Sequence, residues 1–443
     1  MSLPSARSVA ASVLVRVIQD KAFAAAALDA EVARATQLDP RDRGLATELV
    51  YGSLRVLPWL EERITRHAPR GIGGLDPRTR AELFLSAYQL FFLARVPAFA
   101  AVNEAVEAVK QARGAKLAAF ANAVLRRVAQ DAEGTKGDAL LFEATWGSIP
   151  EWLRTALGRT LGDEGARAFC AAGLVPPPLG LRVERAEERE RWLGDLRAAV
   201  PHATFELGKA SPLAILAWGG GRAELWPGAD RGWSVQEEGS QVVALAVGAR
   251  PGDIVLDACA GRGNKASLLS LAVGAGGAVD AADLHPSKLE RLTRQLARGG
   301  KPLRSTFAVD WSVGSGDVAS LYDRALVDAP CSGTGTIRRR PDLVLRREPE
   351  DLARLGSLQA AIVKQVATHV KLGGRLVYAV CSVLREEAED VVEAVLAGET
   401  GLSLAPFDSP EVHALSGDAS TLRLLPDREG TDGYFVASFV RRP

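Results

Sequence analysis

The chain has 443 residues, with 54 lysines and arginines against 54 aspartates and glutamates, and 47% of its residues are hydrophobic. This length suits about three domains of roughly 150 residues each, and the apolar content excludes a disordered chain. The balanced charge gives no overall electrostatic argument for a nucleic-acid partner, so any RNA site must be local.

Four cysteines in so long a chain do not make a disulfide framework, and they suit a reducing compartment. The five histidines do not cluster with cysteines at metal-ligand spacings, so we expect no metal. Residues 1–7 contain no apolar segment, and the apolar stretch at 83–94 is too short to span a bilayer. We therefore expect a cytoplasmic protein, a monomer, with no membrane partner.

Residues 1–131 are predicted to form an all-helical domain. Alanine, leucine and arginine dominate, and strand-like runs are nearly absent. Asp76 and Pro77 make a good helix start, because proline fits the first turn of a helix. The apolar residues of the helix that follows share one face: Leu83, Ala87, Leu90, Phe91 and Ala94. This pattern predicts a helical bundle.

A polar, glycine-bearing stretch at 131–138 is interpreted as a linker. Residues 139–235 then mix helices and strands, which predicts a small α+β module. The helices are expected at 152–161, 163–172 and 186–199, and the strands at 179–183 and 214–218.

From 236 to 443, strand-like and helical runs alternate, which predicts a parallel, doubly wound α/β sheet. The strands are expected at 254–256, 277–282, 306–309, 325–327 and 376–378, with helices including 287–296 and 349–370. The last strand, at 434–439, is predicted to be antiparallel and to form a sheet edge.

A glycine-bearing loop, Asp257-Ala-Cys-Ala-Gly-Arg-Gly-Asn-Lys265, follows the first of these strands. Gly261 and Gly263 permit a tight turn and close approach to a nucleotide. Asp283 comes twenty residues later at a strand end, a spacing that suits a carboxylate holding ribose hydroxyls, and Asp310 follows the third strand. Dinucleotide enzymes share the first two features, and glycines also serve ordinary strand–helix turns.

Two cysteines each follow a predicted strand. Cys331 lies in Asp328-Ala-Pro-Cys-Ser-Gly-Thr-Gly335, and Cys381 lies in Tyr378-Ala-Val-Cys-Ser382. Open α/β sheets bind ligands at the carboxyl ends of their strands. A thiolate there could add to C6 of a cytosine, so that C5 attacks a methyl sulfonium. Asp328, if protonated, could stabilise charge on the ring. The motif alone does not say which cysteine attacks.

The alternative is that these thiols are small buried hydrophobic groups, as most free cysteines are. We expect that role for Cys259, inside the loop, and for Cys170. Two basic segments, Lys288–Arg304 and Arg338-Arg339-Arg340 with the arginines at 346–347, are candidates for an RNA contact or for solvated surface. Of these, Arg338, Arg339 and Arg340 are predicted to bind RNA, because they directly follow a cysteine motif.

The chain resembles the RsmB (Sun) group of ribosomal RNA 5-methylcytosine methyltransferases over nearly all of its length. The two cysteine motifs with Arg338–Asp342 and Glu386-Glu387 carry the resemblance most specifically, together with Gly239-Ser-Gln241 and Asp432-Gly-Tyr-Phe435. The N-terminal third resembles the NusB-like RNA-binding domain of that family. Its matching runs are Glu48–Gly52 with Arg55, Ala87–Leu90, Val102–Ala105 and Asn122–Arg126.

The resemblance implies a Rossmann-like class I methyltransferase domain, the cofactor S-adenosylmethionine, and ribosomal RNA as partner, most simply 16S. It implies Cys381 as nucleophile and Cys331 as the residue that helps product release, with Asp328 and Lys265 also in the catalytic site. The expected cofactor-binding residues are Cys259, Ala260, Gly261, Gly263, Lys265, Asp283, Asp310 and Asp328.

The chain departs from the family pattern in the glycine loop and before Cys381. The loop reads Gly261-Arg-Gly-Asn-Lys-Ala266 where the family has Ala-Pro-Gly-Gly-Lys-Thr, and Val380 replaces a threonine. Two other functions are possible for a chain with these motifs. A DNA cytosine methyltransferase also uses a Pro-Cys motif, but the second cysteine motif and the NusB-like domain argue against it. A non-catalytic, antitermination-type RNA-binding protein would leave the thiols unexplained.

Overall fold

The computed structural model describes residues 4–135, 137–300, 303–319 and 321–443, so Lys136 of the expected linker and Lys301 of the first basic segment lie outside the described residues. The chain divides into two compact units. The first, called the helical unit, comprises Met1–Thr155, Glu164–Val175 and Ile337–Arg347. The second, called the sheet unit, comprises Ala156–Asp163, Pro176–Thr336 and Glu348–Pro443.

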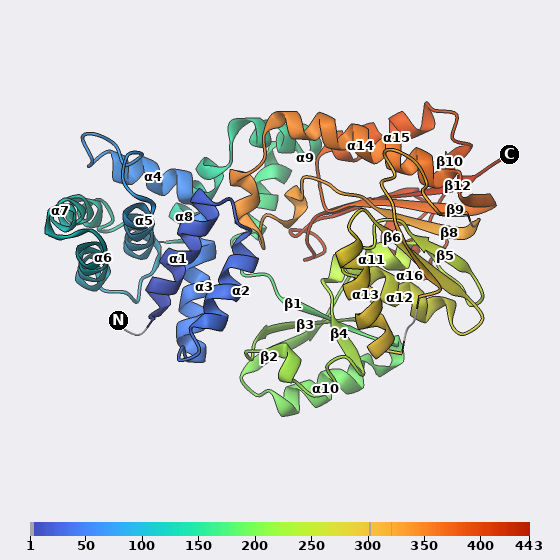
Figure 1. Cartoon of the computed structure of the whole chain (residues 1–443), viewed down its shortest axis with the longest axis horizontal. Coiled ribbons are helices and arrows are strands. Elements are labelled where there is room, and N and C mark those ends of the chain that lie inside the picture. The colour runs from blue at the N-terminus through green and yellow to red at the C-terminus, as the bar shows by residue number, and fades with distance from the viewer. Residues whose placement is uncertain (1–3, 136, 301–302, 320) are drawn as a thin grey trace. The chain divides into compact units, whose positions relative to one another are not determined.

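The helical unit contains no strand among its described residues, as the sequence predicts (Figure 1). The Asp76 side chain accepts a hydrogen bond from the Thr79 backbone N–H at 3.2 Å, which confirms the predicted start of α5. Its helices are α1 (Ala6–Gln19), α2 (Ala24–Arg34), α3 (Pro40–Arg55), α4 (Leu57–Thr65), α5 (Pro77–Phe92), α6 (Ala98–Arg113), α7 (Ala115–Asp131) and α8 (Asp138–Ser148).

The helical unit continues beyond residue 131, where the sequence suggested a domain boundary. Ala144 of α8 is fully buried in the same core as α1 to α7, and the Trp59 backbone N–H donates to Ser148 Oγ at 3.3 Å. The polar stretch after α7 therefore joins two helices of one unit. The two helices expected at 152–172 form α9 (Glu151–Ala172), with a kink at Gly162, whose φ is 73°.

A four-stranded antiparallel sheet in the order β2-β3-β1-β4 forms the small α+β part of the sheet unit. The sequence predicted β1 and β3 but missed β2 and β4, of which β4 has only three residues. The elements are β1 (Leu179–Val183), α10 (Arg189–Ala199), β2 (Ala203–Leu207), β3 (Ala214–Gly219) and β4 (Trp233–Val235). Their core includes Leu268 of the neighbouring α12 (Asn264–Val273), so this sheet packs onto the larger α/β part.

The larger sheet has the order β10-β12-β9-β8-β5-β6-β7, with β11 also pairing with β12. The five expected strands are present and mutually parallel, and β12 is antiparallel to β9 as predicted. The expectation that β12 forms an edge is wrong, because β10 and β11 pair with it. The strands are β5 (Ile254–Asp257), β6 (Ala278–Asp283), β7 (Ser305–Ala308), β8 (Tyr322–Asp328), β9 (Val370–Val380), β10 (Leu402–Leu404), β11 (Thr421–Leu424) and β12 (Tyr434–Arg441).

Helices cover both faces of this sheet (Figure 1). One face packs against α14 (Pro349–Ala367) and α15 (Glu389–Leu396). The other packs against α11 (Glu238–Ala246), α12 (Asn264–Val273), α13 (Pro286–Arg298) and α16 (Pro410–Ser416). No helix in the described ranges is long and apolar enough to cross a membrane.

The chain order reverses across β5, because β6 and β7 lie on one side of this strand and β8 and β9 on the other. A crevice forms at the carboxyl ends of strands where such a reversal occurs, and ligands bind there. The glycine loop follows β5, and the two cysteine motifs follow β8 and β9. All the expected catalytic and cofactor-binding residues except Asp310 lie in these loops, in the first turn of α12 or on the ends of β6 and β8, and Asp310 follows β7.

Candidate active site

Strand register brings the two cysteine motifs together. Asp328 at the end of β8 lies opposite Ala379 of β9, and the Ala329 N–H donates to the Ala379 carbonyl at 2.9 Å. Cys331 and Cys381 follow these paired positions by three and two residues. Their sulfur atoms are 3.2 Å apart, although the residues are 50 positions apart in sequence. Both side chains are half-buried.

Hydroxyl groups and close glycines connect the loops that carry the thiols. Thr334 Oγ1 and Ser382 Oγ are 2.9 Å apart, and the Gly335 N–H donates to the Cys381 carbonyl at 3.0 Å. The Gly335 carbonyl accepts from the Gly433 N–H at 2.8 Å. A side chain at Gly335 would overlap the Gly433 backbone, so glycine is required for this approach.

The pKa values of two thiols, Cys331 and Cys259, are raised above that of free cysteine. The hydrogen bond with Cys381, followed by burial, raises the pKa of Cys331 well above its ordinary value. Burial also raises the pKa of Cys259 in the glycine loop. These two thiols therefore keep their protons at neutral pH, which is consistent with a structural role for Cys259.

Lys265 and Asp328 form an ion pair beside the thiols, with Nζ and Oδ2 2.6 Å apart. Burial lowers the pKa of Lys265, but attraction to Asp328 outweighs it and leaves the pKa raised. Asp328 accepts a hydrogen bond from Lys265 here, so in this arrangement Lys265 is a hydrogen-bond donor beside the thiols. Asp257 at the end of β5 was not expected in the site, and burial raises its pKa to about 7.

Glu387 and Gln359 hold the Cys331 loop in place, and the sequence analysis did not assign them this role. The fully buried Glu387 carboxylate accepts from the Ser332 N–H at 2.7 Å, from the Ser332 hydroxyl and from Gln359 Nε2 at 3.0 Å. Gln359 also donates to the Pro330 carbonyl at 2.9 Å. Glu387 lies in the Glu386-Glu387 motif, but only the fold shows that its carboxylate binds Ser332.

The glycine loop adopts the tight conformation that its sequence predicts. The Ala260 N–H donates to the Ala282 carbonyl of β6. Within the loop, the Gly263 N–H donates to the Ala260 carbonyl at 2.9 Å. Gly263 has φ 84°, and a Cβ atom there would lie 2.8 Å from Leu292. Both the positive φ and this close packing require glycine.

Asp283 lies at the end of β6 against the glycine loop, and 8% of its surface is exposed. Its carboxylate accepts from the Gly261 N–H at 3.0 Å and the His285 N–H at 2.9 Å. Asp310 is exposed after β7 and accepts from the Ser312 N–H at 3.0 Å. A carboxylate at a strand end beside a glycine loop fits a ribose, so these residues fit a nucleoside cofactor. Among the described residues, no group of acids, histidines and cysteines could hold a metal ion.

The arginine triplet after Cys331 is only partly accessible. Arg338 is buried in the helical unit, where its carbonyl accepts from the Arg55 guanidinium at 3.3 Å. Arg339 is half-buried and Arg340 is exposed. The RNA contact of this triplet stays a prediction, with Arg340 as its exposed member and Arg338 buried.

Comparison with known proteins agrees with this architecture. Residues 244–440 match the family described as 16S rRNA methyltransferase RsmB/F, and residues 4–130 match the NusB family. Probable ribosomal RNA small subunit methyltransferase B of Bacillus subtilis (strain 168) is 33% identical, with 100% of each chain covered. Ribosomal RNA small subunit methyltransferase B of Pseudomonas syringae pv. tomato is also 33% identical, covering 98% of this chain and 96% of its own.

Solved structures share the fold. The crystal structure of PH0851 superposes with a TM-score of 0.81 at 22% identity and covers 99% of each chain. The structure of NSun6 from Pyrococcus horikoshii with SFG has a TM-score of 0.57 at 17% identity, covering 67% of this chain and 99% of its own. The full-length sequence matches and this fold show that the chain belongs to the RsmB/Sun family of ribosomal RNA small subunit methyltransferases, with an N-terminal NusB-type helical domain and a C-terminal methyltransferase domain.

Proposed function

We propose that this protein transfers a methyl group from S-adenosylmethionine to C5 of a cytosine in small-subunit ribosomal RNA. The observation that carries the proposal is the 3.2 Å separation of the Cys331 and Cys381 sulfur atoms at the carboxyl ends of β8 and β9. Methylation at C5 needs one group that adds to C6 and another that assists removal of the C5 proton. A pair of adjacent thiols can divide these tasks.

Cys381 is the proposed nucleophile. Its thiolate forms a bond to C6, and the electrons of the C5–C6 double bond become available at C5. Bound S-adenosylmethionine would supply an electrophilic methyl group at C5. Loss of the C5 proton to a base then re-forms the double bond, and the C6–S bond breaks to return the Cys381 thiolate.

Cys331 is the proposed base for this elimination. Its raised pKa, caused first by the hydrogen bond with Cys381, keeps it protonated while Cys381 is free. To act as a base, Cys331 must first lose this proton to solvent; its thiolate then accepts the C5 proton and becomes a thiol again. The resemblance to the RsmB/Sun family, and not this pKa, supports attack by Cys381 and elimination by Cys331.

The Lys265–Asp328 pair is proposed to stabilise the ring after addition. Lys265 carries a positive charge 2.6 Å from the Asp328 carboxylate, and its pKa is raised further by Cys381. A fixed cation beside the nucleophile stabilises charge that develops on the ring more strongly than water would. Asp283 and the loop containing Ala260, Gly261 and Gly263 would hold the ribose side of the cofactor.

Two alanine variants test the assignment of the thiols. Cys381→Ala should transfer no tritium from labelled S-adenosylmethionine to RNA and should form no covalent complex. Cys331→Ala should accumulate a protein–RNA complex that survives denaturing electrophoresis, because addition occurs without elimination. Cys170→Ala, which removes a thiol of the helical unit, is the matched control and should behave as wild type.

Two results would overturn these roles. A complex trapped by Cys381→Ala would make Cys331 the nucleophile. Full activity in both variants would return the two cysteines to ordinary core residues. Transfer to DNA but not to RNA would contradict the proposed substrate.

A further inference from the structure

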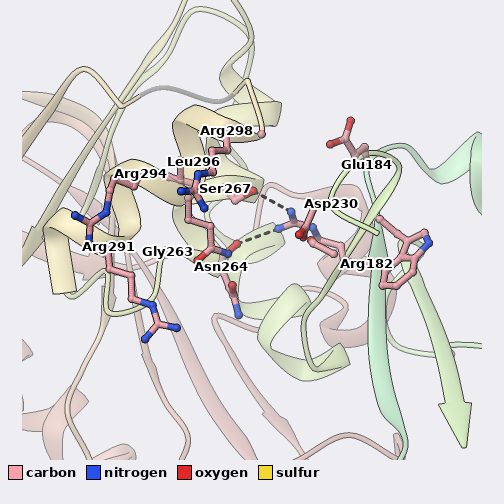
Figure 2. A pocket seen from close by; sticks show the side chains of 14 residues that line it. Arg182, Glu184, Asp230, Gly263, Asn264, Ser267, Arg291, Arg294, Leu296 and Arg298 are labelled. Atoms are coloured by element: carbon pink, nitrogen blue, oxygen red, sulfur yellow. Dashed lines mark hydrogen bonds between the residues drawn. The ribbon is translucent and has the colours of Figure 1, made fainter. Parts of the chain in front are cut away.

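A hollow of about 520 Å³ lies in the sheet unit between the small sheet, the start of α12 and the outer face of α13 (Figure 2). We call it the arginine cavity. Its charged lining consists of four arginines and two carboxylates: Arg182, Arg291, Arg294, Arg298, Glu184 and Asp230. Gly263 is the one expected cofactor-binding residue among its lining residues, so the cavity is a separate space that adjoins the glycine loop.

Arg182 of β1 is a buried cation with neutral partners. Only 1% of its surface is exposed, and its guanidinium donates to Gln236 Oε1, the Asn264 carbonyl and Ser267 Oγ at 2.8–3.0 Å. Glu184, which also lines the cavity, attracts this guanidinium electrostatically, but its three hydrogen-bond acceptors are neutral and its Nε–H has no described hydrogen-bond partner. Burying a charge that is only partly compensated is costly, so a positive charge behind the cavity wall favours an anion in the cavity.

The α13 arginines face the cavity from the opposite side (Figure 2). Arg291, Arg294 and Arg298 lie on one side of the helix, while Leu289, Leu292 and Leu296 are its buried residues. All three arginines are exposed, and none forms an ion pair with a described residue. We call these three arginines the α13 row. At 1.5 Å per residue, the α13 row spans about 10 Å along the helix, which is longer than a single phosphate group.

We propose that the arginine cavity binds successive phosphates of the RNA substrate and holds the strand beside the glycine loop. Three solvated, unpaired guanidiniums in a row match a polyanion, and arginine binds phosphate through paired N–H groups. Burial lowers the pKa of Arg182 to about 10, so this group is also charged at neutral pH. The inference rests on the proposed function for the identity of the polyanion.

The test compares two triple variants with the same change in net charge. The first, Arg291→Gln with Arg294→Gln and Arg298→Gln, removes the α13 row. The control changes three exposed arginines of the sheet unit that do not line the cavity, and it consists of Arg222→Gln, Arg354→Gln and Arg428→Gln. Binding of a transcript of Bacillus subtilis small-subunit ribosomal RNA is measured by fluorescence anisotropy across a salt series.

The cavity variant should raise the Kd for the transcript on the order of tenfold at 0.15 M salt, and its salt slope should fall by about two, since each phosphate contact on a single strand contributes roughly 0.7. The control should keep the wild-type slope, and both variants should bind S-adenosylmethionine as wild type does. Equal slopes in the cavity variant, the control and wild type would overturn the inference.

Failure of the inference and failure of the proposed function are distinguishable. If wild type methylates the transcript and the three slopes agree, the cavity proposal fails and the function stands. If wild type transfers no methyl group, but the salt dependence of RNA binding falls in the cavity variant alone, the phosphate site stands and the proposed chemistry fails.

Discussion

Replacing Glu387 with glutamine should loosen the loop that carries Cys331. The Glu387 carboxylate is fully buried and accepts hydrogen bonds from the Ser332 N–H, the Ser332 hydroxyl and Gln359 Nε2. The amide has nearly the same shape, but it replaces one accepting oxygen with an NH₂ group. At least one of the three donors therefore loses its acceptor and faces another donor.

The cost follows from the charge of the acceptor. A hydrogen bond to a charged group contributes about 1.5–3 kcal/mol, and a buried donor left without a partner carries its own desolvation penalty. We therefore expect Glu387→Gln to reduce the free energy of unfolding of the sheet unit by about 1.5–3 kcal/mol. At roughly 2–4 °C per kcal/mol for a domain of this size, its Tm should fall by roughly 3–12 °C.

Two measurements check this prediction. Thermal unfolding gives the change in Tm, and denaturing electrophoresis gives the lifetime of the RNA adduct, which should lengthen because Cys331 is less well positioned. The matched control is Glu393→Gln, since the exposed Glu393 pairs with the exposed Arg385 and a surface pair contributes at most about 1 kcal/mol. A Tm for Glu387→Gln within about 1 °C of the control, with an unchanged adduct lifetime, would refute the reasoning.

Two further changes give separate readouts. Asp283→Ala should weaken S-adenosylmethionine binding by about 1.5–3 kcal/mol in calorimetry. The control Asp317→Ala changes an exposed carboxylate after β7 and should bind as wild type does. Equal affinities of the two variants for S-adenosylmethionine would remove Asp283 from the cofactor site. Asp257→Asn should raise the Tm above pH 7 and leave it unchanged near pH 4. The pKa of Asp257 is about 7 in the folded protein and roughly 3.9 in the unfolded chain. The stability that its protonated form contributes is therefore present below pH 4 and is lost as pH rises through 7. A difference in Tm between the variant and wild type that does not change with pH would contradict this.

Much of the fold was predictable because its signals are local. Asp76 and Pro77 start α5 through contacts within one helical turn, and alternation of apolar runs marked the five parallel strands. The sequence also located the glycine loop and the two cysteines at strand ends. Strand ends of a parallel sheet meet at one edge, so their convergence was expected before any distance was known.

Other features depend on packing between distant segments, which no local pattern records. The two thiols are 3.2 Å apart because β8 and β9 pair in one register, and a different register would separate them. Arg338 follows a cysteine motif in sequence, yet it is buried in the helical unit. The hydrogen-bond partners of Arg182 come from segments 54 to 85 positions away, so its burial, its neutral acceptors and its cavity follow only from how β1 packs against α12.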